Sequence, residues 1–215
     1  RFHENWGDKE VADAVAIYHR ALLEPGEGEA ALMYLKDRGV APSTIAQFQL
    51  GYSPAAGDVL IQSMKARGYT VQVLEECGLA KRSDDGSRFY DNFRGRIMFP
   101  ITDLQGRVVA FGGRALGDRA PKYLNSPETR LYNKSRHLYG LSFSKEAIRT
   151  RDQAILVEGY LDFVIPFQHG VRNLVASLGT GLTQQQVELL GRYTREVVVS
   201  YDPDSAGVAA AQRSL

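Results

Sequence analysis

The sequence predicts an α/β protein of two parts, a mixed α+β N-terminal subdomain with a basic face and then a parallel sheet covered by helices. Amphipathic helical periods fill the first third of the 215 residues, strand-like runs begin near residue 86, and strands alternate with helices in the tail. A hydrophobic content of 44% and a charged content of 24% are those of an ordinary globular protein. No apolar run reaches 18 residues, so no membrane span is predicted.

The N-terminal third reads as a series of helices separated by short breaks. Val11, Val15 and Leu22 recur in helical period and follow acidic residues, which predicts a first helix over residues 8–24. A second helix is closed by Gly39. The remaining helices predicted in this third span residues 44–51, 58–68 and 71–78.

The rest of the chain changes to strands and then to alternating elements. Two strands, residues 96–103 and 107–116, flank the loop Leu104-Gln105-Gly106, and residues 117–135 read as loop. A helix near residues 142–149 precedes the alternating tail. Its strands are predicted over 154–159, 173–179 and 196–202, and its helices over 160–170, 183–193 and 205–215. This alternation is typical of a parallel sheet, and Thr183 is expected to be an N-cap.

Charge is distributed unevenly along the chain. Residues 94–136 carry 9 Lys/Arg against 3 Asp/Glu, residues 1–93 carry 10 against 14, and residues 151–215 carry 5 against 7. A basic block followed by a more acidic one indicates a polyanion site beside a metal site. Cys77 is the one cysteine, which excludes an internal disulfide and a multi-cysteine zinc site, and a reducing cytoplasm is the simplest compartment.

Acidic residues occur where two predicted strands end. Glu158 ends one strand and Asp162 lies one helical turn later, while Asp202 and Asp204 follow another strand. Ligands gather at the carboxyl ends of parallel strands, and a hard divalent cation such as Mg²⁺ would relieve the repulsion among these carboxylates. A single acid of this kind is more simply explained as a helix N-terminal carboxylate. The two pairs together favour metal binding.

Several of these segments are recognisable. The stretches "VEGYLD", "VASLGTGLT" and "YDPDSAG" closely resemble the metal-binding core of the Toprim fold. Upstream, "FRGRIMFPI", "GRVVAFGGRAL", "PKYLNSPET" and "LYNKSRHLYG" resemble, in the same order, the basic segments of bacterial DnaG-type DNA primases. The resemblance covers nearly the whole chain. It implies a basic primase subdomain over residues 1–140 and a Toprim subdomain, incomplete at its C-terminus, over residues 141–215.

The resemblance also implies an activity and a set of site residues. Members of the family are RNA polymerases that synthesise short primers on single-stranded DNA for replication, by two-metal phosphoryl transfer. Glu158, Asp202 and Asp204 would be catalytic and would hold two Mg²⁺ or Mn²⁺ ions, with Asp162 assisting. The residues implied to bind nucleotide or DNA are Arg38, Arg94, Arg96, Arg114, Lys122, Tyr123, Asn125 and Lys134. From the residues alone, Tyr123 fits base stacking and packing equally well.

Partners and missing parts follow from the same resemblance. The implied partners are a single-stranded DNA template, ribonucleoside triphosphates and the RNA primer, in the bacterial cytoplasm at the replication fork, with no membrane. The replicative helicase and the single-strand binding protein would be contacted through domains absent from these residues, and zinc would be held only in such a domain. The family pattern continues with a further strand and acidic cluster, so we expect weak activity from this chain alone.

Two other functions fit parts of the pattern. A Toprim nuclease or topoisomerase shares the acidic residues, but its chemistry gives the segment around "PKYLNSPET" no role. A DNA-binding module that keeps the Toprim fold without catalysis is the second, and retention of Glu158, Asp202 and Asp204 argues against it.

Overall fold

The computed structural model describes residues 7–118, 120–178 and 181–201, and within them the chain forms two compact units. The first unit comprises the chain up to Ile101 together with Arg107–Tyr132, and the second comprises Thr102–Gly106 and the chain from Asn133 onward. The contacts thus divide the chain near residue 132, whereas the boundary expected after residue 140 remains a prediction. In the described part of the chain, no helix combines the length and apolar character needed to cross a membrane.

The first unit is built from five α-helices and six strands within its described residues. The helices are α1 (Asp8–Leu23), α2 (Glu29–Asp37), α3 (Pro42–Gln47), α4 (Val59–Lys65) and α5 (Val71–Glu76). The strands are β1 (Gly51–Ser53), β2 (Ala80–Arg82), β3 (Phe89–Asp91), β4 (Arg96–Thr102), β5 (Val108–Ala115) and β6 (Tyr123–Asn125). Each helix lies within or beside a range that its apolar period predicts.

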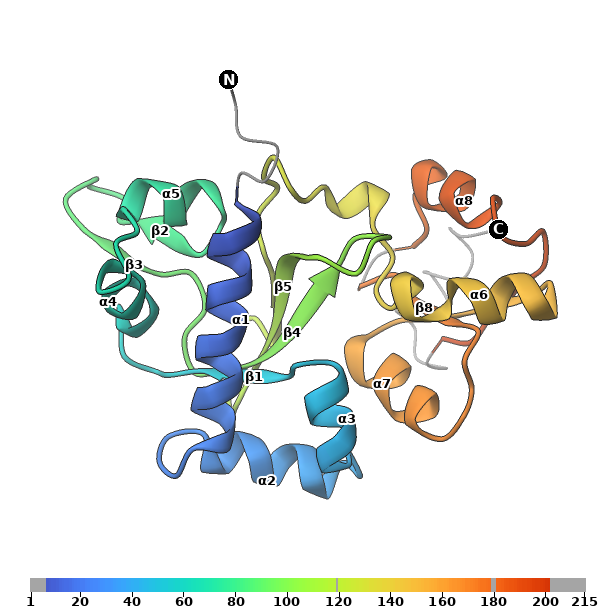
Figure 1. Cartoon of the computed structure of the whole chain (residues 1–215), viewed down its shortest axis with the longest axis horizontal. Coiled ribbons are helices and arrows are strands. Elements are labelled where there is room, and N and C mark those ends of the chain that lie inside the picture. Colours follow the sequence, from blue (N-terminus) through green and yellow to red (C-terminus); the bar gives the residue numbers. More distant parts are fainter. Residues whose placement is uncertain (1–6, 119, 179–180, 202–215) are drawn as a thin grey trace. The chain divides into compact units, whose positions relative to one another are not determined.

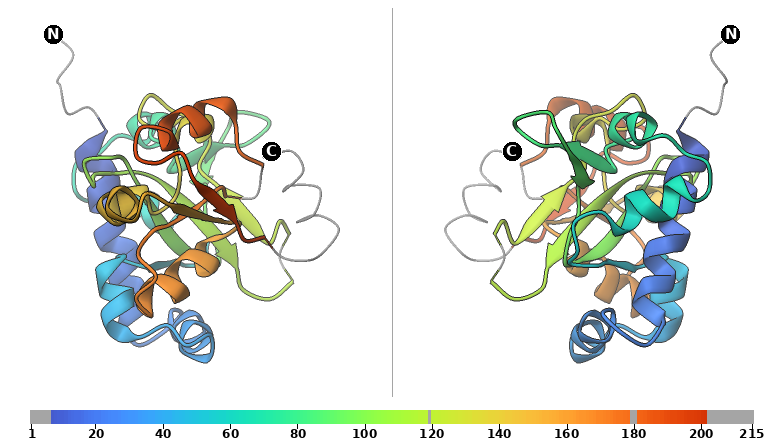
Figure 2. Two further views of the ribbon diagram at one scale, coloured as in Figure 1. Left: turned by 90° about the vertical axis from the view of Figure 1, so that its right-hand side faces the viewer. Right: turned by 90° about the vertical axis from the view of Figure 1, so that its left-hand side faces the viewer.

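A four-stranded sheet in the order β1-β4-β5-β6 forms the centre of this unit, and helix α1 runs along it (Figures 1 and 2). The helix approaches β1 closely because Gly51 has no side chain: a Cβ there would lie 2.6 Å from the Cβ of Tyr18. Val11, Tyr18, Met98 and others form a buried core between helix and sheet. Tyr18 meets the ring of Phe111 edge-on at 5.4 Å between centroids.

A separate two-stranded hairpin, β2–β3, lies beside α5. Its register pairs Ala80 with Asp91 and Lys81 with Tyr90. Neither this hairpin nor strands β1 and β6 are predicted from the sequence, and residues 123–125 are wrongly predicted as loop. Strands of three residues are too short to show a period of two, so only pairing with their neighbours identifies them.

The second unit contains a parallel three-stranded sheet in the order β8-β7-β9, which confirms the predicted Toprim-like architecture. Its elements are the short 3-10 helix η1 (Lys134–Arg136), α6 (Leu141–Arg151), β7 (Ala154–Val157), α7 (Tyr160–Gln168), β8 (Leu174–Ala176), α8 (Gln184–Leu190) and β9 (Val197–Val199). Leu156 and Val175 lie in its buried core. The helix expected over residues 205–215 falls outside the described residues.

Helix α8 begins where the sequence predicts. The Thr183 hydroxyl accepts a hydrogen bond from the Gln186 N–H at 3.1 Å, and the Gln186 Oε1 accepts one from the Thr183 N–H at 3.0 Å. This reciprocal capping box satisfies two N–H groups that a helix end leaves without partners. The Gln186 Nε2 also donates to the carbonyls of Lys134 and His137, which ties α8 to η1.

A buried carboxylate in the first unit makes its stability depend on pH. Asp91 is fully buried and accepts hydrogen bonds from the N–H groups of Leu60 at 2.8 Å and Ile61 at 3.0 Å, at the start of α4. Burial raises the pKa of Asp91 from 3.8 to about 6, because it outweighs the two N–H groups, which lower it. The folded chain therefore holds this proton more tightly than the unfolded chain does.

We expect the contribution of Asp91 to stability to be greatest below about pH 4 and to be lost as the pH rises through about 6. Compared with Asp91→Asn, the wild-type chain should lose on the order of 3 kcal/mol of unfolding free energy across that interval. Urea unfolding of both proteins between pH 4 and 7 measures the difference. Parallel pH profiles would contradict the prediction.

Candidate active site

The carboxylate of Glu158 lies at the C-terminal end of β7, the central strand of the parallel sheet. Its side chain is half-buried. The backbone is fixed on one side, because the carbonyls of Val157 and Glu158 accept hydrogen bonds from Ser177 at 3.1 Å and Leu178 at 3.0 Å. Leu178 has a φ of 64°, a conformation that non-glycine residues rarely adopt. The two strand ends are therefore held together beside Glu158.

Asp162 lies in the first turn of α7 and caps the N-terminus of that helix. Its Oδ2 accepts a hydrogen bond from the Gly159 N–H at 2.9 Å. A Cβ on Gly159 would lie 3.0 Å from the same oxygen, so a glycine at this position lets the carboxylate approach the backbone. One oxygen of the Asp162 carboxylate thus accepts a hydrogen bond at the start of the helix, as expected of a helix N-terminal carboxylate. Metal binding is the other explanation that the sequence offers for an acid at this position.

A depression of about 240 Å³ contains both carboxylates. It is lined by Val157, Glu158, Asp162, Pro166, Ser200 and Tyr201. The Ser200 N–H donates to the Leu156 carbonyl at 2.8 Å, so the chain leaving β9 stays beside β7. Asp202 and Asp204 come next along the chain but lie outside the described residues.

Carboxylate oxygens at the mouth of an open depression are the donors that Mg²⁺ and Mn²⁺ prefer, so the described half of the acidic cluster fits such an ion. Within the described residues, which include Glu158 and Asp162 but neither Asp202 nor Asp204, no group of three or more His, Cys, Asp and Glu side chains is placed to hold a metal ion. The predicted ligand set stays a prediction.

The first unit brings two of the predicted arginines together on one aromatic ring, with a third predicted residue beside one of them. The Arg114 guanidinium carbon lies 4.0 Å from the centre of the Tyr34 ring, and that of Arg38 lies 5.1 Å from it. The Tyr123 ring, on β6, has its centre 6.0 Å from the guanidinium carbon of Arg114, its cross-strand partner on β5. Cation–π contacts of this length hold guanidinium groups in place without neutralising them.

Tyr34 is the residue of this cluster that sequence reasoning missed. It lies on α2 four residues before Arg38, the C-cap residue of that helix, so the two side chains lie on one side of the helix end. That spacing was the available signal for the Tyr34–Arg38 pair. Nothing in the sequence indicated that Arg114, eighty residues further along, would stack on the same ring.

Arg94 and Arg96 stand two residues apart but differ in their surroundings. Arg94 is half-buried, and its guanidinium lies 4.7 Å from the Tyr90 ring centre. Arg96 is only 4% exposed, and its Nη1 donates to the carbonyls of Gly113 at 3.2 Å and Pro121 at 2.9 Å. Arg96 therefore links β5 to the segment before β6 through hydrogen bonds. The Arg94 guanidinium instead lies against the Tyr90 ring, which leaves its charge in place.

The remaining predicted residues lie on and after β6. Lys122 is exposed, and its carbonyl accepts a hydrogen bond from the Ala115 N–H at 2.9 Å. Tyr123 is 40% exposed, and Asn125 lies on the same face of β6 because its side chain is two residues further on. Lys134 belongs to the second unit, in η1.

Comparison with known proteins matches the two parts of the chain separately. Residues 18–145 match the family described as the DNA primase catalytic core, N-terminal domain, and residues 152–215 match the Toprim domain. The DNA primase of Synechocystis sp. is 43% identical over 209 residues, which is 95% of this chain and 33% of that protein. The chain therefore spans about a third of the length of the curated relatives that it matches.

Solved structures show the same likeness in three dimensions. A DNA primase domain from Pseudomonas aeruginosa is 38% identical with a TM-score of 0.91, over 97% of this chain and 65% of that one. The catalytic domain of a DnaG primase bound to single-stranded DNA is also 38% identical, with a TM-score of 0.87 over 98% of this chain and 65% of that one. Both sequence identities are higher than those of proteins that share only a fold.

Proposed function

Since this chain belongs to the family of bacterial DnaG-type DNA primases, we propose that it forms the catalytic core of an enzyme that synthesises short RNA primers on single-stranded DNA. The observation that carries the proposal is the match of 98% of the chain to a DnaG catalytic domain that was solved with single-stranded DNA. An acidic strand end in the second unit and tyrosine-held arginines in the first supply the two kinds of group that nucleotidyl transfer uses.

Glu158, Asp202 and Asp204 are proposed to hold two Mg²⁺ or Mn²⁺ ions, with Asp162 assisting. When bound, such ions lower the pKa of the primer 3′-hydroxyl and neutralise charge on the incoming triphosphate. The chain itself contributes position: β7 presents Glu158, and the hydrogen bond from Gly159 fixes Asp162 beside it. Preset orientation of this kind is a large part of catalysis when charge neutralisation and alignment dominate the reaction.

The basic residues are proposed to bind phosphate groups of template and nucleotide. Arg38 and Arg114 share the Tyr34 ring, so both guanidinium groups are held in place before a strand binds. Lys122 and the 40% exposed Tyr123 extend this surface, with Asn125 on the same face of β6. Tyr123 has the exposure that stacking on a base requires.

The wider setting of the enzyme is proposed from the family as well. The template is single-stranded DNA, the substrates are ribonucleoside triphosphates, and the product is the RNA primer. The replicative helicase and the single-strand binding protein would be contacted through parts of the longer relatives that this chain does not match, and zinc would be held there too. The enzyme would act in the bacterial cytoplasm, at the replication fork in the nucleoid.

Two measurements distinguish this function from the other two. We expect metal-dependent incorporation of labelled ribonucleotides on single-stranded DNA by a protein that contains this chain, and weak incorporation by the 215 residues alone. A Toprim nuclease or topoisomerase would nick supercoiled DNA instead. Metal-independent DNA binding without incorporation, by the longer protein as well, would favour a non-catalytic Toprim module and overturn the proposal.

A further inference from the structure

A cationic pocket of about 290 Å³ lies beside the β2–β3 hairpin in the first unit. Its lining includes three basic side chains: Lys81 from β2, Arg96 from the start of β4, and Arg94 from the segment just before β4. Tyr90 of β3 and Pro121 line it as well. Among the described residues that line the pocket there is no carboxylate. A concave surface with cations and no anion among these residues attracts anionic ligands.

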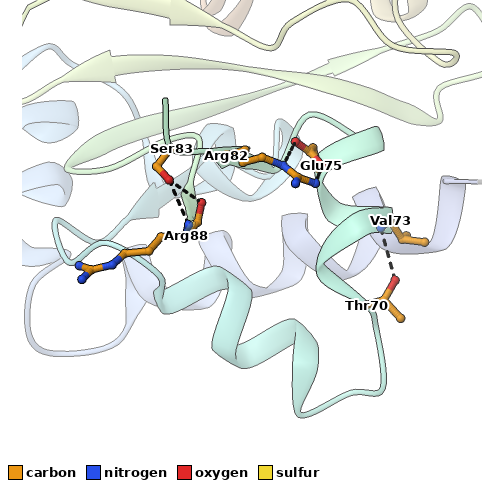
Figure 3. A network of polar contacts seen from close by, with 6 residues as sticks. All are labelled: Thr70, Val73, Glu75, Arg82, Ser83 and Arg88. Atoms are coloured by element: carbon orange, nitrogen blue, oxygen red, sulfur yellow. Dashed lines mark hydrogen bonds and ion pairs between the residues drawn. The ribbon is translucent and has the colours of Figure 1, made fainter. Parts of the chain in front are cut away.

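The hairpin directs its two neighbouring cations to opposite faces. Lys81 pairs with Tyr90 across the hairpin, and both side chains line the pocket. Arg82 is one residue further along β2, so its side chain projects from the other face. There its guanidinium lies 3.3 Å from the Glu75 carboxylate (Figure 3). It also lies 4.6 Å from the centre of the Phe89 ring. Arg82 is neutralised within the fold.

The pocket cations are not neutralised in this way. In the described part of the chain, neither the Lys81 ammonium nor the Arg94 guanidinium donates a hydrogen bond or forms an ion pair. Lys81 is exposed, and Arg94 lies on the Tyr90 ring and acts on the buried Asp91 only from a distance. Arg96 donates hydrogen bonds to the carbonyls of Gly113 and Pro121, and these bonds hold its side chain in the wall of the pocket. A lysine point charge and a stacked guanidinium are together a suitable receptor for a phosphate group.

We propose that this pocket binds a phosphate group, with Lys81 and Tyr90 of the β2–β3 hairpin as parts of the site that neither the family resemblance nor the comparisons assign. The proposal rests on the proposed function, which supplies two sources of the group, a phosphodiester of the DNA strand and the triphosphate of a nucleotide. Lys81 contacts the phosphate directly. Tyr90 is a positioning residue that holds the Arg94 guanidinium toward it.

Lys81→Ala and Arg82→Ala form a matched pair, because each removes one positive charge from the same strand. Binding of a fluorescent single-stranded oligonucleotide is measured by anisotropy over a range of salt concentrations, and binding of a fluorescent guanosine triphosphate analogue is measured in parallel. We expect Lys81→Ala to weaken strand binding roughly threefold to tenfold near 0.1 M salt and to reduce the salt slope by about 0.7. Arg82→Ala should leave the salt slope unchanged. Lys81→Arg, which keeps the positive charge, should have the wild-type salt slope.

If Lys81→Ala weakens binding of the guanosine triphosphate analogue but not of the oligonucleotide, the result also supports the pocket and identifies the triphosphate as its ligand. If Lys81→Ala equals Arg82→Ala in both assays while Arg114→Ala loses affinity, the pocket is overturned and the proposed function stands. If neither the wild-type chain nor Arg114→Ala shows salt-dependent binding of DNA or nucleotide, the proposed function fails and the pocket with it. Unchanged unfolding midpoints for Lys81→Ala and Arg82→Ala, whose side chains are exposed, show that these two variants fold.

Discussion

Replacing Glu158 by glutamine is expected to reduce primer synthesis at least about 100-fold, because it removes the central charge of the acidic cluster while keeping the shape of the side chain. Glu158 stands at the end of the central strand, half-buried in the depression it shares with Asp162. Its backbone position is set by hydrogen bonds from residues 177 and 178, which the substitution leaves in place. The fold should therefore survive while the function is lost.

The measurement is ribonucleotide incorporation on single-stranded DNA, together with binding of Mn²⁺ followed by calorimetry. Glu146→Gln is the matched control, since Glu146 is an exposed carboxylate of the same unit whose partner is Arg149 on the same helix. Asp162→Asn keeps an acceptor for the Gly159 N–H and is expected to reduce synthesis less than Glu158→Gln does. Wild-type synthesis and wild-type Mn²⁺ affinity in Glu158→Gln would rule out the proposed role of this carboxylate.

Gly113→Ala is expected to destabilise the first unit and to weaken DNA binding. A Cβ at this position would lie 2.7 Å from Cδ1 of Phe93 and 2.9 Å from Cδ of Arg96. Phe93 is fully buried against Phe111, and Arg96 bonds to the Gly113 and Pro121 carbonyls, so neither side chain can move without losing contacts. We expect a loss of about 1–3 kcal/mol of unfolding free energy from this overpacking.

Binding of single-stranded DNA should weaken in the same variant, because Arg114 follows Gly113 directly and Arg96 walls the cationic pocket. Urea unfolding and oligonucleotide anisotropy measure the two effects. Gly57→Ala is the control: no heavy atom lies within 4 Å of the Cβ position there, so its stability should change by less than about 1 kcal/mol. Equal unfolding free energies for the two variants would contradict the packing argument.

The elements that carry long apolar periods were predictable. Helix α1 repeats buried residues such as Val11 and Leu22 at helical spacing, and β7 is a continuous apolar run between turn residues. The parallel pairing of β7 with β8 and β9 follows from their alternation with helices. The cap at Thr183 was predictable too, because capping depends on side chains within a few residues of one another.

The short strands and the partners of the cations were not predictable. The β2–β3 hairpin has three residues in each strand, so no periodicity marks it. Adjacent charges on it, Lys81 and Arg82, look equivalent in the sequence, yet one lines a pocket and the other pairs with Glu75. Arg94 and Arg96 look equally available, yet Arg96 is 4% exposed and bonds to two carbonyls.

The sequence by itself determined the family, the parallel sheet and the position of Glu158 at the end of a strand, because these depend on motifs and on local periodicity. Only the tertiary structure decided which basic residues are engaged by partners within the fold and which line an open pocket. That choice depends on segments far apart in the chain: Tyr34 meets Arg114, and Arg96 meets Pro121. Burial and hydrogen bonding to such partners set the availability of a charge, and neither is encoded in the residues next to it.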